Sequence, residues 1–499
     1  MSEDLDRFLD VPNGDASLHR KLNVWEAVGL SMALMAPSMA ININPQGAAQ
    51  VVGRAVPLAF LLATIGVLLI AYNFVRLSQR FSHAGSLYAF VGATVGPRAG
   101  SVAGWLTIGT YLFYGVVTST AAGIFADDLL RRWGLWPDSP RWLPHCCAVL
   151  LLAVVWVLAS RDVKRGTRLL LIVEGLTVGL VLLVATITLV KLVVGQAPRG
   201  QRFDLSVFSV SSDTQLSAVF LGVVFGFLSF AGFEAAAALG EETNRPKRDI
   251  PRAILGTAVF GGAFFAAVTA VAMMGFGTDD AGVAAFVKSE ALIDDLSRQY
   301  VAAWLGDVIV VGAMVSAAAC CLACVVAGSR LVFALSRDGM GPRALAAVHE
   351  TWNVPHVAVG ACVALVALTQ VFAWAVGTAP FDLFLTSGGA GTLILLVAYA
   401  LATVGTMRLL VSGNGDARAR EVVIPVLGLV LLCYTLYRNV IPWQTGAELW
   451  GSALAMATLL VVVVAVLARP AAARRAGLKL MQAAGLESTS SARAEPREP

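Results

Sequence analysis

Charged side chains are scarce in this chain of 499 residues: Asp, Glu, Lys and Arg make up 14% of it, whereas 58% of the residues are hydrophobic. In average soluble domains about a quarter of the residues are charged. A helix that crosses a bilayer needs about 20 mostly apolar residues, and this chain contains many runs of that kind. The scarcity of charge therefore excludes an ordinary soluble protein and predicts an all-α polytopic membrane protein.

Groups that carry enzymatic chemistry are also sparse. The five histidines lie in loops or at the ends of apolar runs. Cys321 and Cys324 form a C-x-x-C on an apolar run with no histidine or acid nearby, so we interpret them as buried apolar side chains rather than metal ligands. We find no phosphate loop, nucleophile elbow or helical H-E-x-x-H. The sequence thus predicts no enzyme, no cofactor and no metal site, and its net charge of +4 gives no reason to expect nucleic acid.

About twelve apolar runs are long enough to span a bilayer. The third and the eighth are the longest, which predicts that they tilt or extend past the membrane face. The predicted spans are 24–51, 55–79, 98–130, 144–160, 166–194, 215–240, 251–276, 302–336, 356–377, 381–407, 422–438 and 449–468.

The spans divide the chain into four parts. Residues 1–22 are polar and lack the apolar core of a cleavable signal, so the first span is expected to be retained. Residues 23–410 are the expected ten-helix core, and residues 411–469 add helices 11 and 12. Residues 470–499 are expected to form a disordered tail, after a short interfacial helix around 477–486.

Basic residues predict the orientation of the chain. Short loops rich in Lys and Arg stay on the cytoplasmic side of a membrane, and here these residues follow the even-numbered spans. Both termini are therefore expected in the cytoplasm of a multi-pass cell-membrane protein. The loop residues are Arg76, Arg80, Arg161, Lys164, Arg165, Arg245, Lys247, Arg248, Arg337, Arg343, Arg418 and Arg420.

Two spans carry polar interruptions. In the sixth span, Gly232 and the acid Glu234 interrupt an apolar run. In the first span, Pro37 removes a helix hydrogen bond, and the polar residues Ser38, Asn42 and Asn44 lie close to it in the sequence. Irregular backbone survives at membrane depth only where it lines a cavity or a binding site. We interpret both places as discontinuous helices, and an ordinary proline kink stays open for the first.

The spacing of these breaks is informative. Spans one and six are five spans apart, and an odd number of spans inverts the topology. This arrangement is typical of two inverted five-helix repeats whose broken helices meet at the substrate site. The long third and eighth spans occupy matching positions, and spans eleven and twelve lie outside the repeat.

Four stretches resemble the permeases of the amino acid–polyamine–organocation (APC) superfamily. They are "GFLSFAGFEAAAALGEETNRPKRDIPRAI", "FSHAGSLYAFVGATVGPRAGSVAGW", "GSRLVFALSRDGMGP" and "VHETWNVPHVAV". The resemblance implies a LeuT-type fold, a 5+5 inverted repeat with discontinuous helices 1 and 6. One stretch departs from the family pattern: where a G-x-G type run is usual at the first break, this chain has "APSMA".

The breaks predict how a substrate is held. Free amides after Pro37 at a positive helix end should meet a carboxylate, and carbonyls of the second break should accept from an ammonium group. Phe230 or Phe233 is a candidate cover, and Tyr111 or Tyr114 a candidate pocket residue, although packing is the commoner role of such aromatics. The candidate substrate-binding residues are Ala36, Pro37, Ser38, Met39, Ala40, Leu228, Phe230, Ala231, Gly232, Phe233 and Tyr111.

Two acids are candidates for coupling or gating. Glu234 opens the second half-helix, either as a simple cap of free amides or as the protonation-sensitive gate that the resemblance implies. Glu174 is the only ionisable residue well inside the fifth span, and such residues are functional candidates. The alternative for Glu174 is an ion pair with Arg168 or Lys164.

The eighth span bears on the coupling ion. In sodium-coupled relatives this helix supplies neighbouring hydroxyls, whereas here Ser316 is followed by Ala317. The resemblance therefore favours protons over sodium, with Glu174 as the titratable group.

The sequence as a whole predicts a secondary active transporter of amino acids or related small amines, proton-coupled and working by alternating access. Because the expected pocket holds no further acid, a neutral substrate side chain is favoured. A polyamine or amine carrier, an amino acid exchanger and a ligand sensor that does not transport remain alternatives.

Overall fold

The structure is a computed structural model that describes residues 23–81, 87–161, 166–210, 215–239, 243–349, 352, 354–411 and 419–483. These residues form helices joined by turns and loops. The helices of the first half are α2 (Val24–Met35), α3 (Pro37–Val52), α4 (Val56–Arg80), α5 (Leu87–Thr94), α6 (Pro97–Arg132), α7 (Leu143–Ala159) and α8 (Gly166–Val194). Those of the second half are α9 (Val219–Phe230), α10 (Pro246–Phe276), α11 (Asp280–Lys288), α12 (Leu292–Tyr300), α13 (Ala303–Arg337), α14 (His356–Ala375), α15 (Pro380–Val411), α16 (Val423–Val440), α17 (Gly446–Ala468) and α18 (Pro470–Ala483).

The described residues contain ten segments that are long and apolar enough to cross a membrane. One of them, Val24–Arg80, comprises α2, α3 and α4, and α7 is a shorter apolar helix outside the ten. These segments confirm the predicted all-helical, polytopic architecture. The third and eighth predicted spans are indeed long, since α6 has 36 residues and α13 has 35.

The largest difference at a predicted boundary is at the seventh span, and three short helices were missed. The seventh span was expected to begin at residue 251, but α10 begins at Pro246, because proline suits the first position of a helix and Asp249 favours its first turn. The loop helices α5, α11 and α12 are too short to appear as apolar runs. Only the first part of the expected interfacial helix is described, as the end of α18; residues 1–22 and 484–499 lie outside the described residues.

The first break lies at Ala36. This residue takes left-handed dihedral angles, φ 45° and ψ 58°, between the end of α2 and the start of α3. Pro37 causes the interruption, since it has no N–H and its ring clashes with the preceding helical turn, while as the first residue of α3 it fits without strain.

The second break follows α9. Ala231 leaves the helix with φ −54° and ψ 124°, Gly232 has φ +100°, and a short 3₁₀ helix, η4 (Ala235–Leu239), resumes after Glu234. A Cβ atom on Gly232 would lie 2.5 Å from Leu34 Cβ. Glycine is therefore required for the backbone angle and for the close approach of the two breaks.

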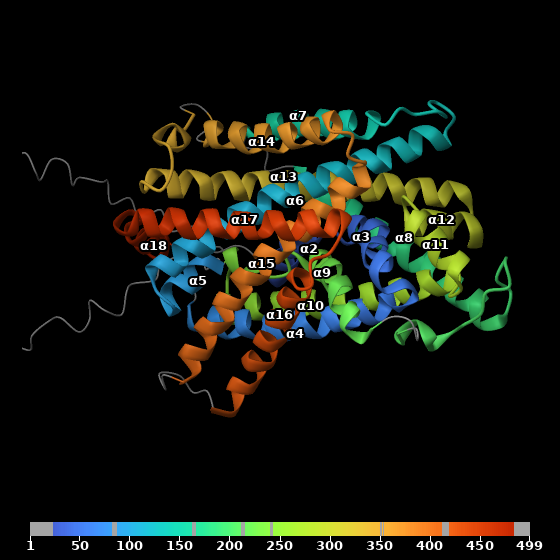
Figure 1. The fold of residues 1–499 in the computed structure, drawn as a ribbon, viewed down its shortest axis with the longest axis horizontal. Helices are drawn as coiled ribbons and strands as arrows, with labels where there is room; N and C mark the ends of the chain where they lie inside the picture. Colours follow the sequence, from blue (N-terminus) through green and yellow to red (C-terminus); the bar gives the residue numbers. More distant parts are fainter. Residues whose placement is uncertain are drawn as a thin grey trace, which may run out of the picture.

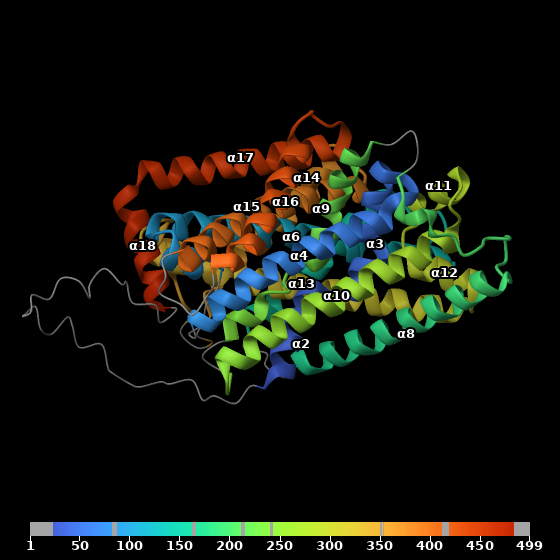
Figure 2. The ribbon, with the colours of Figure 1, turned by 90° about the horizontal axis from the view of Figure 1, so that it is seen from below.

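Helices far apart in the sequence pack in pairs. α3 packs against α9, α4 against α10, α6 against α13, and α7 against α14. In Figure 1 α7 and α14 lie along one side of the molecule and α4 along the other, with the broken helices between them. Figure 2 shows α8 on one face and α17 on the opposite face. The breaks thus lie in the interior of the bundle.

The two ends of the bundle differ. Both views place α5 and α18 at one end and α11 and α12 at the other. At the α5 end, Lys479 of α18 pairs with Asp338 at 3.1 Å, and the Ser101 hydroxyl donates to the Ala473 carbonyl at 2.6 Å. These contacts hold α18 against α6 and the end of α13.

Ion pairs cover the α11–α12 end. Arg131 pairs with Glu290, Arg132 with Asp294, and Arg298 with Asp307. Burial raises the pKa of Asp294 to about 6, against the opposing effect of Arg132 and Arg298. The Ile293 amide donates to Asn42 Oδ1 at 3.0 Å, so α12 is also fastened to α3.

Candidate functional site beside two broken helices

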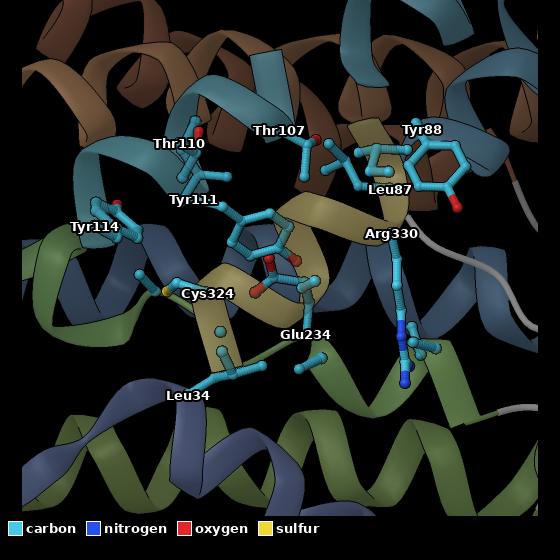
Figure 3. A pocket seen from close by; sticks show the side chains of 18 of the residues that line it. Leu34, Leu87, Tyr88, Thr107, Thr110, Tyr111, Tyr114, Glu234, Cys324 and Arg330 are labelled. Carbon is cyan, nitrogen blue, oxygen red and sulfur yellow. The ribbon is translucent and has the colours of Figure 1, made fainter. Parts of the chain in front are cut away.

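A cavity of about 310 Å³ lies beside the second break. Its lining extends from Leu34, Ala231 and Gly232 at the breaks to Tyr88 of α5 and Ala334 near the end of α13. It therefore reaches toward the α5 end of the bundle. Figure 3 shows Thr107, Thr110, Tyr111 and Tyr114 of α6 along one wall, with Glu234 facing them.

Glu234 is the acid of this pocket. It follows the second break, and its main-chain carbonyl accepts from the Ala237 amide at 2.8 Å at the start of η4. In Figure 3 its carboxylate and the Tyr111 ring point toward one another. The Tyr399 hydroxyl faces the same carboxylate from another side, outside hydrogen-bond geometry, and Glu234 Oε2 has no other partner among the described residues. A buried carboxylate oxygen without a partner is costly and favours a cationic ligand.

Glu174 closes the first break from α8. Its Oε1 accepts from the Ser38 amide at 2.9 Å, and both of its carboxylate oxygens accept from the Ser38 hydroxyl at 2.9 Å. Only 6% of Glu174 is exposed. The Ser316 hydroxyl of α13 faces the same carboxylate, outside hydrogen-bond geometry. A side chain 136 residues away therefore caps the N-terminus of α3.

Two further side chains satisfy the backbone at the breaks. The Cys320 thiol donates to the Leu34 carbonyl at 3.1 Å, at the end of α2. The Ser31 hydroxyl donates to the Phe233 carbonyl and accepts from the Ala236 amide, both at 3.0 Å. Cys320 and Ser31 thus provide, from α13 and α2, partners that the interrupted helices cannot provide themselves.

The predicted site residues do not all reach the cavity. Ala231, Gly232, Tyr111 and Glu234 line it, whereas Ala36 to Ala40 do not. The remaining five candidates are buried outside the lining: Leu228, Phe230, Phe233, Glu174 and Ser316.

The two candidate covering rings pack into the core. Phe230 lies 5.3 Å from Phe265 between ring centroids, and Phe233 packs against Phe74 at 5.9 Å and Tyr399 at 6.0 Å. The Phe230 carbonyl accepts from the Phe233 amide at 3.0 Å. These two residues therefore pack the second break against the core and do not line the cavity.

Sequence reasoning missed Ser31, Cys320, Tyr88 and Arg330. The signal for Ser31 and Cys320 was a polar or polarisable side chain inside an apolar run; Tyr88 lies on a short helix that apolar periodicity does not reveal. Arg330 lines the cavity near the end of α13, beside Leu87 and Tyr88 in Figure 3. The loop acids Glu241 and Glu242, and the side chains of Lys164 and Arg168, lie outside the described residues.

The part of the chain that the structure describes contains no group of three or more His, Cys, Asp or Glu side chains that could hold a metal ion. The lining of the cavity presents one carboxylate, the Arg330 guanidinium, hydroxyls, aromatic rings and backbone at the second break.

Comparison with known proteins identifies the family. Residues 28–477 match the amino acid permease family. An uncharacterized transporter of Mycobacterium tuberculosis is 28% identical, over 84% of this chain and 86% of its own length. The low-affinity putrescine importer PlaP of Escherichia coli is 27% identical over 60% of this chain and 63% of its own. The branched-chain amino acid permease BcaP of Lactococcus lactis is 24% identical over 79% and 82%. The chain belongs to the amino acid permease family.

Proposed function

We propose that this chain is a secondary active transporter of amino acids or related small amines that works by alternating access. The observation that carries the proposal is the cavity beside two touching helix breaks, with Glu234 at its wall. Broken helices at membrane depth bring backbone polar groups to a ligand without a covalent step. The absence of a nucleotide-binding motif from the sequence favours an ion gradient or exchange as the energy source.

The helix pairing supports twelve spans with a 5+5 inverted repeat. Counting α2 and α3 as one broken span and adding α7, the spans that pack together are one with six, two with seven, three with eight and four with nine. Each pair joins positions five apart, as expected when two inverted repeats are interleaved. Helices α16 and α17 then lie outside the repeat.

The loop charges support a cytoplasmic location for both termini and for the α5 end. With that orientation, the cavity reaches toward the cytoplasm and the ion pairs of α11 and α12 cover the outer end. The described conformation is then inward-facing. Transport requires the Arg131–Glu290 and Arg132–Asp294 pairs to separate when the outer side opens.

Coupling to protons rests on Glu174. This buried carboxylate joins α8 to α3 through Ser38, so a change in its protonation alters a contact between two moving elements. One proton charge moved through 100 mV yields about 2.3 kcal/mol, enough to sustain a useful substrate gradient. Ser316, without a second hydroxyl beside it, supports protons over sodium.

The substrate is proposed to lie between the breaks, with its ammonium group toward Glu234 and the second-break carbonyls. PlaP is named as a putrescine importer and BcaP as a branched-chain amino acid permease, so relatives of both chemistries support a small molecule that carries an amine. A polyamine carrier is the second candidate, favoured by the partnerless oxygen of Glu234.

Counterflow in proteoliposomes tests the proposal. Vesicles loaded with unlabelled substrate should accumulate labelled substrate from outside, and an imposed inward proton gradient should drive uptake without sodium. A strict requirement for sodium would contradict the coupling. Saturable binding without any counterflow would instead identify a sensor.

A further inference from the structure

We propose that Glu174 is a built-in carboxylate that fills the anion site of the first break, and that the pocket therefore selects a cationic amine without a carboxylate over the matching amino acid. This inference rests on the proposed function, because it assumes that the pocket binds the transported molecule. It assigns Glu174 a specificity role in addition to coupling.

The first step concerns the start of α3. A helix N-terminus favours one negative charge through its free amides and dipole. Here the Ser38 amide and hydroxyl both donate to Glu174, a side chain that is only 6% exposed. A substrate carboxylate at the same amide would be repelled by the negative charge of Glu174. The internal acid thus excludes a second anion.

The second step is that Glu174 is held in place. Its helix α8 packs against α3 and α13. Gly312 of α13 allows this approach, since a Cβ atom there would lie 2.1 Å from Thr177 Oγ1, one turn beyond Glu174. In the described conformation, Glu174 therefore lies on a helix that packs closely against both of these neighbours.

The third step is that the cation site lies at the other break. The Leu34 carbonyl at the first break already accepts from the Cys320 thiol. Glu234 Oε2, in contrast, has no partner among the described residues and belongs to a carboxylate that lines the cavity. An ammonium group at Glu234 would gain a charge-assisted hydrogen bond.

Aromatic rings strengthen that site. Tyr111 and Tyr114 line the same cavity on the side of α6 that faces Glu234 (Figure 3). The face of a tyrosine ring attracts a cation through its negative π-electron density. An acid with aromatic neighbours is the combination expected for a buried amine.

The remainder of the lining limits the body of the ligand. Leu34, Ala231, Ala327 and Leu331 make much of it apolar, and Arg330 opposes a second positive charge at the other end. A volume of about 310 Å³ suits a small molecule. The favoured class is a primary monoamine with an aliphatic or aromatic body.

Matched ligand pairs test the selection. Isoamylamine and leucine, or phenethylamine and phenylalanine, differ only in the carboxylate. With the purified full-length protein, each amine should bind at least tenfold more tightly than its amino acid. Glu234→Gln should weaken amine binding at least tenfold. Glu174→Gln removes the negative charge but keeps an acceptor for Ser38, so the preference for the amine should shrink at least tenfold.

Controls separate this inference from the proposed function. Glu26→Gln, at an exposed acid at the start of α2, should leave the ligand preference as in the wild type. Tighter binding of leucine than of isoamylamine by the wild type would overturn the selection, as would amino acid binding that Arg330→Gln abolishes, because the carboxylate would then be held at Arg330. Preferred amine binding without counterflow would contradict transport and support the selection, whereas counterflow of leucine alone would do the opposite.

Discussion

The two helix breaks are in contact with each other, but their polar groups differ in whether they have hydrogen-bond partners. At the first break, Glu174 binds the Ser38 amide and Cys320 binds the Leu34 carbonyl. At the second break, the Ser31 hydroxyl donates to the Phe233 carbonyl. Glu234 Oε2, in contrast, has no hydrogen-bond partner among the described residues, and the Glu234 carboxylate lines the cavity. An interrupted helix is therefore not by itself a vacant site. The first break is closed by the protein's own side chains, whereas the second borders the cavity and is the one at which we propose that the ligand binds.

The largest expected effect comes from filling the cavity at the second break. Ala231→Trp would place an indole ring in a cavity lined by Ala231 itself, so transport should fall at least 100-fold while the protein remains folded. Uptake into proteoliposomes and elution on gel filtration measure both properties. Ala284→Trp, at an exposed alanine of α11, is the matched control and should transport normally. Normal transport by Ala231→Trp would contradict the proposed binding site.

A substitution of Gly232 tests the contact between the two breaks. Gly232→Ala should destabilise the protein by about 2–5 kcal/mol, since overpacking costs about 1–3 kcal/mol and an unfavourable backbone conformation adds about 1–3 kcal/mol. The new Cβ atom would lie 2.5 Å from Leu34 Cβ at a residue with φ +100°. Thermal unfolding in detergent measures the change.

Gly256→Ala is the control for that experiment. This glycine lies in α10 with no atom within 4 Å of an added Cβ atom, and alanine favours a helix over glycine by about 0.5–1 kcal/mol. The two substitutions should therefore change stability in opposite directions. Equal effects would show that the breaks do not press on each other.

The dependence of stability on pH tests a second buried acid, Asp294 of α12. Burial raises the pKa of Asp294 to about 6, so the folded protein binds this proton more tightly than the unfolded chain does. The stabilisation is fully present below the ordinary pKa of an aspartate and is lost as the pH rises through about 6. The stability of wild type relative to Asp294→Asn should therefore fall between pH 4 and pH 8, by about 1–3 kcal/mol.

Asp204 should make stability depend on pH in the opposite direction. Hydrogen bonds from the Ser206 hydroxyl and amide lower its pKa, so its contribution is present above the ordinary pKa and is lost in acid. The stability of wild type relative to Asp204→Asn should rise with pH. A parallel trend for Asp204→Asn and Asp294→Asn would refute the assignment of these two environments.

The smallest expected effect concerns the thiol at the first break. Cys320→Ala removes the donor to the Leu34 carbonyl and should cost about 1 kcal/mol, whereas Cys320→Ser keeps a donor and should cost less. Denaturation midpoints compare the two. Cys433→Ala, at an exposed cysteine, should be neutral.

The sequence was sufficient to predict an all-helical, multi-pass protein because apolar runs and their interruptions are local signals. Pro37 and Gly232 mark both breaks, and the predicted limits of α8, 166–194, match those of the structure. The pairing of Ser38 with Glu174 joins residues 136 positions apart, and that of Leu34 with Cys320 joins residues 286 apart. No periodicity encodes such contacts, so the sequence predicted polar groups at the first break but not that the chain itself would occupy them.

The most direct test compares Glu174→Gln with Glu234→Gln in the same proteoliposomes, by counterflow at equal pH and by uptake under an imposed proton gradient. If the first break serves coupling and the second binds substrate, Glu174→Gln should retain counterflow and lose the response to the gradient. Glu234→Gln should lose substrate affinity and therefore both activities at low substrate concentration. Unchanged gradient-driven uptake in Glu174→Gln, or the same defect in both variants, would contradict the division of roles between the two breaks.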